Sequence, residues 1–203
     1  MFNTAKDVIK KLKDEQDKET NNIWAGSKFE FISDLKIDYS GKVGEITIYE
    51  FLKENTDWEI IFNGDSNTNP EDGTYDIKIN GLRGEIKTAR LGKSSTKNKF
   101  GGNFQHENLK NSDECDYIIL LDFEPNQYHI TILDSKIDLK KPIEQFNNIT
   151  PHNRPGTNNF KLDLKRSTSI EESKKRGFSL VDIKEDTDCK EIIEFFGKFF
   201  IKK

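Results

Sequence analysis

Residues 73–90, GTYDIKINGLRGEIKTAR, carry two carboxylates and a lysine at spacings that could serve one reaction. Asn80-Gly81 between alternating apolar runs predicts a two-residue β-hairpin turn, because such turns need positive φ. Asp76 would then lie opposite Glu85, with Cβ atoms about 5 Å apart, and Lys87 would follow on the same face. Opposed like charges are destabilising, so the pattern predicts a compensating cation.

These three residues form a minimal set for metal-assisted hydrolysis of a phosphodiester. Asp76 and Glu85 would hold Mg²⁺, with Mn²⁺ as a substitute, and water would fill the other positions. The metal would polarise a phosphoryl oxygen and lower the pKa of a bound water, while Lys87 orients that water or neutralises developing charge. We therefore predict Asp76, Glu85 and Lys87 to be catalytic. The alternative is a surface hairpin whose polar face lies in water, with Asp76 offset by Arg83 on the diagonal.

Glu45 is a further candidate metal ligand. On a predicted helix from about Gly41 to Glu54, capped by Ser40, it shares an apolar stripe with Ile48 and Leu52. An unpartnered carboxylate there would be costly, so Glu45 needs either the same metal or a structural lysine. Glu50 points to the opposite side of the helix.

Polar residues after the hairpin are candidate DNA contacts. The loop and short helix predicted around LGKSSTKNKFGGNFQHENL offer lysines and carboxamides suited to phosphates and base edges, although a plain surface loop would have a similar composition. Residues 76–110 carry a local net charge of +5 and residues 151–176 one of +4, against −4 for the whole chain. The predicted contacts are Thr88, Arg90, Lys93, Lys97, Lys99, Asn103, Gln105, His106, Asn108, His152, Arg154 and Lys161.

The elements expected to position these residues alternate between helix and strand. Besides the helix containing Glu45, helices are predicted at 4–18, near 29–35, at 103–111, in a segment ending at Gly177, and at the C-terminus. Strands are predicted at 58–62, 74–79, 82–90, 116–123 and 127–133, with two more in FKLDL and FSLVDI. This order predicts an α/β (α+β) fold in which helices flank a mixed sheet, in a single domain over residues 1–203.

The order of elements and the motif resemble the PD-(D/E)xK nuclease superfamily. Asp76 and Glu85-Ile86-Lys87 are similar to its D-x8-ExK motif, and Glu45 in GKVGE is similar to the helix glutamate that many members place near the metal. FQHENL resembles the helix that follows the ExK strand in Type II restriction endonucleases, and PHNRPGTNNFKLDL resembles a downstream polar segment of some of them. The resemblance covers about 40–123, with additions at 124–203. The expected Pro-Asp dipeptide is missing, which leaves Asp72, or Glu50, as a substitute acid.

The resemblance implies a restriction-endonuclease-like core and a Mg²⁺-dependent, sequence-specific endonuclease. Such an enzyme would act as a homodimer on double-stranded DNA and leave 5′-phosphates, as part of a restriction-modification pair with a cognate DNA methyltransferase. A structure-specific repair or recombination nuclease of the same fold is the first alternative. A non-catalytic DNA-binding module is the second.

Composition places the chain among folded proteins, with fifteen Phe in 203 residues despite a charged fraction of 33%. We expect a cytoplasmic protein, since no apolar run suits a signal peptide or a membrane span. Cys115 and Cys189 are expected to be buried thiols. The histidines at 106, 129 and 152 show no metal-site spacing, so surface or loop positions are expected for them.

Overall fold

The computed structural model describes residues 1–14, 24, 26–63, 75–91, 103–109, 114–140, 149–151, 160–165 and 179–201. Its helices are α1 (Phe2–Asp14), η1 (Glu30–Asp34), α2 (Ile37–Asn55), η2 (Asp138–Lys140) and α4 (Cys189–Phe200). Its strands are β1 (Ile60–Phe62), β2 (Ile77–Ile79), β3 (Leu82–Arg90), β4 (Asn103–Leu109), β5 (Tyr117–Phe123), β6 (Tyr128–Asp134), β7 (Ile149–Pro151), β8 (Phe160–Lys165) and β9 (Ser179–Ile183). Within this part of the chain, no helix is long and apolar enough to cross a membrane.

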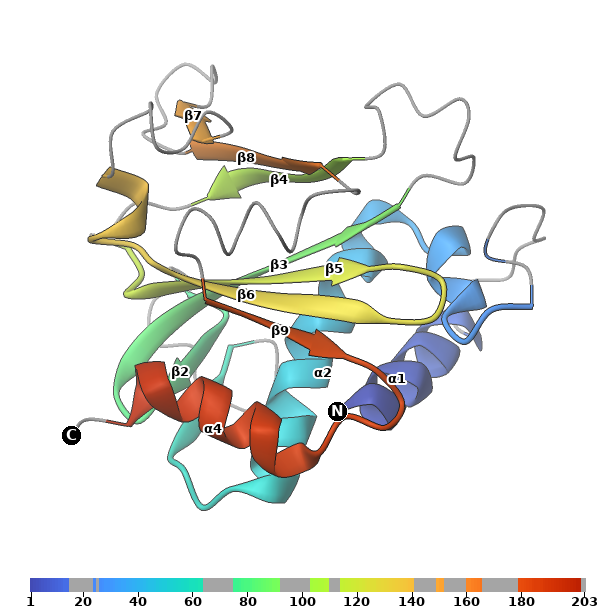
Figure 1. Cartoon of the computed structure of the whole chain (residues 1–203), viewed down its shortest axis with the longest axis horizontal. Coiled ribbons are helices and arrows are strands. Elements are labelled where there is room, and N and C mark those ends of the chain that lie inside the picture. Colours follow the sequence, from blue (N-terminus) through green and yellow to red (C-terminus); the bar gives the residue numbers. More distant parts are fainter. Residues whose placement is uncertain are drawn as a thin grey trace.

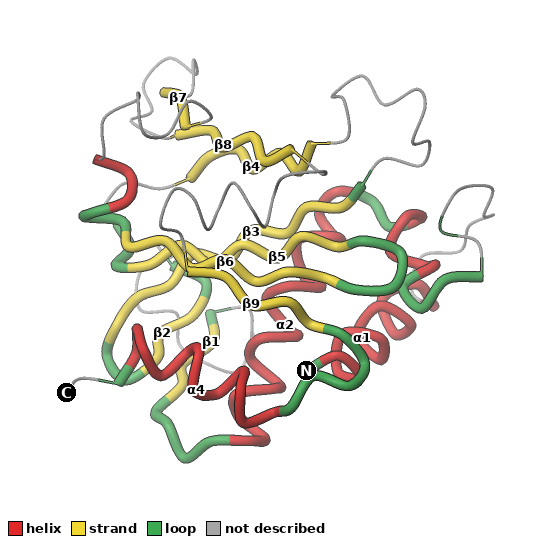
Figure 2. Tube along the Cα trace, in the orientation of Figure 1, coloured by secondary structure: helices red, strands yellow, loops and turns green. Residues whose placement is uncertain are grey.

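The elements form three layers, with helices on one face of a six-stranded sheet and a three-stranded sheet on the other (Figures 1 and 2). The larger sheet has the order β1-β2-β3-β5-β6-β9, in which β3 and β5 run parallel and the other neighbours are antiparallel. The smaller sheet has the order β4-β8-β7. The predicted mixed α/β class, a mixed sheet flanked by helices, is confirmed.

The hairpin between β2 and β3 forms in the predicted register. Asn80 and Gly81 adopt φ values of 48° and 81°, as the two-residue turn requires, and Ile77 pairs with Gly84. The side chain of Asn80 also donates to the carbonyl of Phe200, which ties the turn to α4. Turn chemistry and alternation are both local properties of the sequence, so they fix this hairpin independently of distant contacts.

The helical layer covers the face of the large sheet that carries Ile86 and Leu121. Helix α2 lies across β3, and α1 packs against α2. The apolar residues Val43, Ile48, Phe51 and Leu52 of α2 are completely buried. Helix α2 begins at Ile37, earlier than predicted, so Ser40 lies inside the helix and does not cap it.

The small sheet corrects one predicted element. Residues 103–109 form strand β4 and not the helix that FQHENL resembles. The buried residues Phe104 and His106 are two positions apart, which is the period of a strand, and β4 pairs with β8 in antiparallel fashion. Pairing with a strand distant in the sequence therefore determines the conformation of this segment.

The expected environments of the cysteines and histidines also need correction. Cys115 is buried as expected, but Cys189, the first residue of α4, is exposed. His106 and His129, expected on the surface or in loops, are 2% and 1% exposed, respectively. His152 and the predicted helix ending at Gly177 lie outside the described residues.

Candidate active site

Asp76 directly precedes strand β2, at the end of the pairing between β2 and β3. Its backbone N–H donates to the carbonyl of Gly84 at 3.0 Å, and its own carbonyl accepts the N–H of Asn63 at 3.0 Å. Its carboxylate accepts the N–H of Ile86 at 2.7 Å. The ladder ends at Ile77, so the expected direct pairing of Asp76 with Glu85 is replaced by a side-chain bond to the next residue of β3. Backbone and side chain together fix this carboxylate beside β3.

Glu85 and Lys87 are neighbours on one face of β3 and form an ion pair. The side chain of Glu85 is 2% exposed and that of Lys87 is 28% exposed, so the carboxylate lies inside the protein while the ammonium reaches solvent. A polar hairpin face lying in water is therefore wrong for Glu85. Arg83, expected to offset Asp76, instead donates its backbone N–H to Asp116 at 2.9 Å, with its Nε 3.6 Å from the same oxygen.

Glu45, partly buried on α2, belongs to the same electrostatic cluster. The pKa of Glu45 is raised to about 7, first by burial and then by the negative charges of Asp76 and Glu85, against the lowering effects of Lys87 and Lys42. An ordinary glutamate titrates well below this pH. The interactions show that α2 and the hairpin bring four predicted residues together, which we call the acidic cluster: Glu45, Asp76, Glu85 and Lys87.

The acidic cluster offers oxygen donors of the type that Mg²⁺ prefers. Among the described residues, however, no three acidic, histidine or cysteine side chains lie together at metal-ligand spacing. The ligand set predicted from the sequence, Asp76, Glu85 and Glu45, stays a prediction. The arrangement fits a cation held by one or two carboxylates, with water and phosphate oxygens completing its coordination. Asp76 and Glu85 would hold it. Glu50 is partly buried on α2, and Asp72 lies outside the described residues.

Three of the predicted DNA contacts bond to other residues of the protein; His106 is buried, and Thr88 and Arg90 are partly exposed. The Thr88 hydroxyl donates to the carbonyl of Gly41 at 3.2 Å, and Arg90 donates to the carbonyl of Ser33 at 2.8 Å. His106 is 2.7 Å from Asp122. These side chains hold α2, η1 and β4 against the large sheet. Asn103, Gln105, Asn108 and Lys161 lie on β4 or β8 with only their backbones described, and Lys93, Lys97, Lys99, His152 and Arg154 lie outside the described residues.

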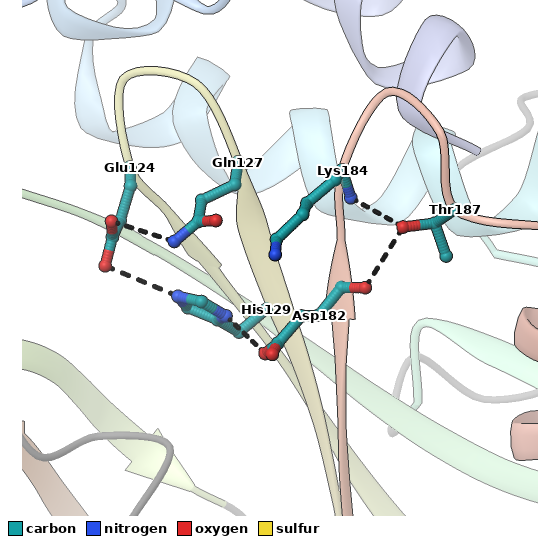
Figure 3. A network of polar contacts seen from close by, with 6 residues as sticks. All are labelled: Glu124, Gln127, His129, Asp182, Lys184 and Thr187. Atoms are coloured by element: carbon teal, nitrogen blue, oxygen red, sulfur yellow. Dashed lines mark hydrogen bonds and ion pairs between the residues drawn. The ribbon is translucent and has the colours of Figure 1, made fainter.

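A second polar cluster, which the sequence did not reveal, lies at the other end of the large sheet. His129 of β6 lies between Glu124 and Asp182, at 3.4 Å from Nε2 and 2.9 Å from Nδ1 (Figure 3). Gln127 donates to the other oxygen of Glu124. We call His129, Glu124 and Asp182 the histidine network.

The electrostatics of the histidine network favour a charged imidazole. Burial alone would lower the pKa of His129, but hydrogen bonds to Asp182 and Glu124 and the charges of Asp182 and Asp122 raise it to about 9. The network is thus a carboxylate pair with a cation between its members. Only the register of β5, β6 and β9 brings these residues together, with His129 opposite Asp122 and Asp182. No spacing in the sequence could have signalled it.

No protein-family profile, curated protein or solved structure matches this chain.

Proposed function

We propose that this protein is a Mg²⁺-dependent endonuclease that hydrolyses phosphodiester bonds of double-stranded DNA. In the finer form of the proposal it is a Type II restriction enzyme that acts as a homodimer, recognises a specific sequence and leaves 5′-phosphates. One observation carries the proposal. Glu45, Asp76, Glu85 and Lys87, selected from the sequence for this chemistry, come from a helix and both arms of a hairpin and interact electrostatically.

The arrangement of the core elements supports the same proposal. A helix, α2, precedes three antiparallel strands, β1, β2 and β3, and strand β5 then returns parallel to β3. This agrees with the order expected from the resemblance to PD-(D/E)xK nucleases, except that strand β4 stands where a helix was expected. A crossover between parallel strands is usually but not always a helix, and the exception leaves the hairpin and α2 in place.

Lys87 and Glu45 have chemical roles suited to their burial. A divalent cation, when bound, would polarise the phosphoryl oxygen and acidify a water molecule. Lys87, partly exposed beside Glu85, can neutralise charge that develops on the phosphate or orient the attacking water. Glu45, with a pKa of about 7, can hold or release a proton near neutral pH.

Cleavage of supercoiled plasmid and phage DNA by the purified protein tests the proposal. Incubation with Mg²⁺ should give discrete bands, and EDTA should abolish them. Sequencing of the fragment ends would identify the site and the 5′-phosphate. A smear, or preference for branched DNA, would replace site-specific cleavage with a repair or recombination activity. Absence of cleavage with Mg²⁺ and Mn²⁺ on unmethylated DNA would contradict the enzyme.

A further inference from the structure

Helix α2 and strand β3 meet at a close contact immediately beside the acidic cluster. The hydroxyl of Thr88, the residue after Lys87, donates to the carbonyl of Gly41 at 3.2 Å. Gly44, the residue before Glu45, faces the same hydroxyl. A Cβ atom on Gly44 would lie 2.2 Å from Thr88 Oγ1, a distance that non-bonded atoms do not tolerate. The missing side chain of Gly44 and the carbonyl of Gly41 therefore form a notch in α2 that accepts Thr88, which we call the Gly41–Gly44 notch.

The walls of this notch are rigid. Besides Thr88, the Cβ on Gly44 would lie 3.4 Å from Ile86 Cγ2 and 3.5 Å from Leu121 Cδ1. Ile86 is 3% exposed and Leu121 is completely buried. The space for a methyl group would then come from moving α2 away from β3 or from turning the Thr88 hydroxyl away, which breaks its bond to Gly41.

The notch is adjacent to functional residues on both elements. In an α-helix the carbonyl of residue 41 also accepts the N–H of residue 45, so the Thr88 bond is made to the turn that carries Glu45. The carboxylate of Glu45 folds back over that turn, with Oε1 3.9 Å from the position of a Cβ on Gly41. On β3, Thr88 directly follows Lys87. This contact therefore fixes α2, which carries Glu45, against β3, which carries Glu85 and Lys87.

We propose that Thr88 is a positioning residue, which acts through the Gly41–Gly44 notch to hold Glu45 against the Glu85–Lys87 pair. This inference rests on the proposed function, since it assigns Thr88 to the assembly of that same site. It gives Thr88 a role inside the protein, in place of the DNA contact expected from the sequence.

The two glycines provide a matched pair of variants. Both lie inside α2, so Gly→Ala gives the same gain in helix propensity at either position. A Cβ on Gly41 makes an ordinary van der Waals contact, whereas one on Gly44 collides with Thr88. The readout is the titration midpoint of the Glu45 side-chain carboxyl carbon, followed by NMR without divalent cations, together with plasmid cleavage.

We expect Gly41→Ala to keep the midpoint of Glu45 near 7. Gly44→Ala should lower it by about one unit, because burial and the charge of Asp76, the two largest causes of the raised pKa, both weaken when α2 moves away from β3. Cleavage by Gly44→Ala should fall by about tenfold or more, since small displacements of catalytic groups are costly. The double variant Gly44→Ala/Thr88→Ala removes the colliding hydroxyl together with its bond to Gly41, so it should reverse part of the change in midpoint. A merely structural role predicts additive losses instead.

Substitutions of Thr88 keep the test valid if Gly44→Ala does not fold. Thr88→Ser retains the hydroxyl and should retain the midpoint, whereas the isosteric Thr88→Val should shift it. Equal midpoints in Gly44→Ala, Thr88→Val and the unmodified protein would overturn the inference. Midpoints that shift as expected in a protein that cleaves no DNA would refute the proposed function and leave the positioning role intact.

Discussion

The acidic cluster and the histidine network both bring carboxylates together on the large sheet, but they differ in where the cation lies. In the histidine network the cation is central, because His129 bonds Glu124 and Asp182 through its two ring nitrogens. In the acidic cluster the cation is shared, because Lys87 pairs with Glu85 while Asp76 and Glu45 add negative charge nearby. The network has the composition of a structural clamp. The acidic cluster instead brings the Glu45 carboxyl group, whose pKa is raised to about 7, close to the Glu85–Lys87 ion pair.

The pKa shifts express the same difference. In the histidine network the carboxylates favour the charged form of the histidine, and the pKa of His129 rises to about 9. In the acidic cluster, burial and neighbouring acids favour the neutral form of a carboxyl group, and the pKa of Glu45 rises to about 7. A carboxyl group whose pKa is raised in this way is typical of functional sites.

The largest effect is expected from removal of Lys87, which should affect cleavage through the acidic cluster and leave the histidine network unchanged. Lys87→Ala should reduce plasmid cleavage by about 10²- to 10³-fold, because charge developing on the phosphate is no longer neutralised. DNA binding, followed by fluorescence anisotropy in Ca²⁺, should persist. The control Lys10→Ala changes an exposed lysine of α1 and should cleave normally. Unaltered turnover of the Lys87 variant would remove this lysine from the mechanism.

Removal of the central cation from the histidine network should affect stability but not chemistry. His129→Ala leaves Glu124 and Asp182 facing a cavity without their shared donor, and should lower the free energy of unfolding by about 2 to 4 kcal/mol. Urea denaturation at pH 7 measures the loss, with Asp186→Ala on the exposed neighbouring turn as the control. A loss as small as that of the control would mean that the network contributes little to stability.

The two regions should lose stability in different pH windows. Both pKa values are raised on folding, so each group stabilises the protein below its unfolded pKa and loses that contribution as the pH rises through its folded pKa. For Glu45 the window runs from 4.5 to about 7, and for His129 from 6.5 to about 9. Each contribution is up to about 3 kcal/mol.

Thermal unfolding across this range, in buffer without divalent cations, tests the two windows. Glu45→Gln should abolish the lower step and His129→Gln the upper one. Mg²⁺ should reduce the lower step alone, because a bound cation offsets the charge of the acidic cluster. A lower step that persists in Glu45→Gln would assign it to another group.

The smallest effect on stability without Mg²⁺ is expected from neutralising Asp76, a proposed metal ligand, without changing its shape. Asp76→Asn can still accept the N–H of Ile86 through its amide oxygen, so the fold should persist. The charge of Asp76 contributes to the raised pKa of Glu45, which should fall by about one unit, and Mg²⁺ should no longer raise the melting temperature. A large drop in melting temperature without Mg²⁺ would mark Asp76 as a structural residue instead.

The sequence predicts the hairpin well because the hairpin depends on local chemistry. The Asn80-Gly81 turn and the alternation of apolar residues determine which side chains share a face, and strand β3 has the predicted bounds. Glu45 could be placed in the acidic cluster because an acid in an apolar stripe needs partners.

Features that depend on distant pairing could not be predicted from the sequence. The residues of β4 alone predict a helix, and only their pairing with β8 makes them a strand. Glu85 likewise appears exposed when the hairpin is considered alone. The histidine network exists only because three strands meet in one register. Ser40 has a residue type that favours the start of a helix, but α2 begins earlier, at Ile37.

Along the chain, strands of the large sheet alternate with strands of the small sheet, and this order has a consequence for engineering. It runs from β3 to β4 in the small sheet, returns for β5 and β6, leaves again for β7 and β8, and ends the large sheet with β9. Neither sheet is a contiguous stretch of chain, so no single truncation or fusion point isolates one from the other. Transplanting the small sheet between related scaffolds would require four splice junctions, and a circular permutant opened between β8 and β9 would begin with the edge strand β9.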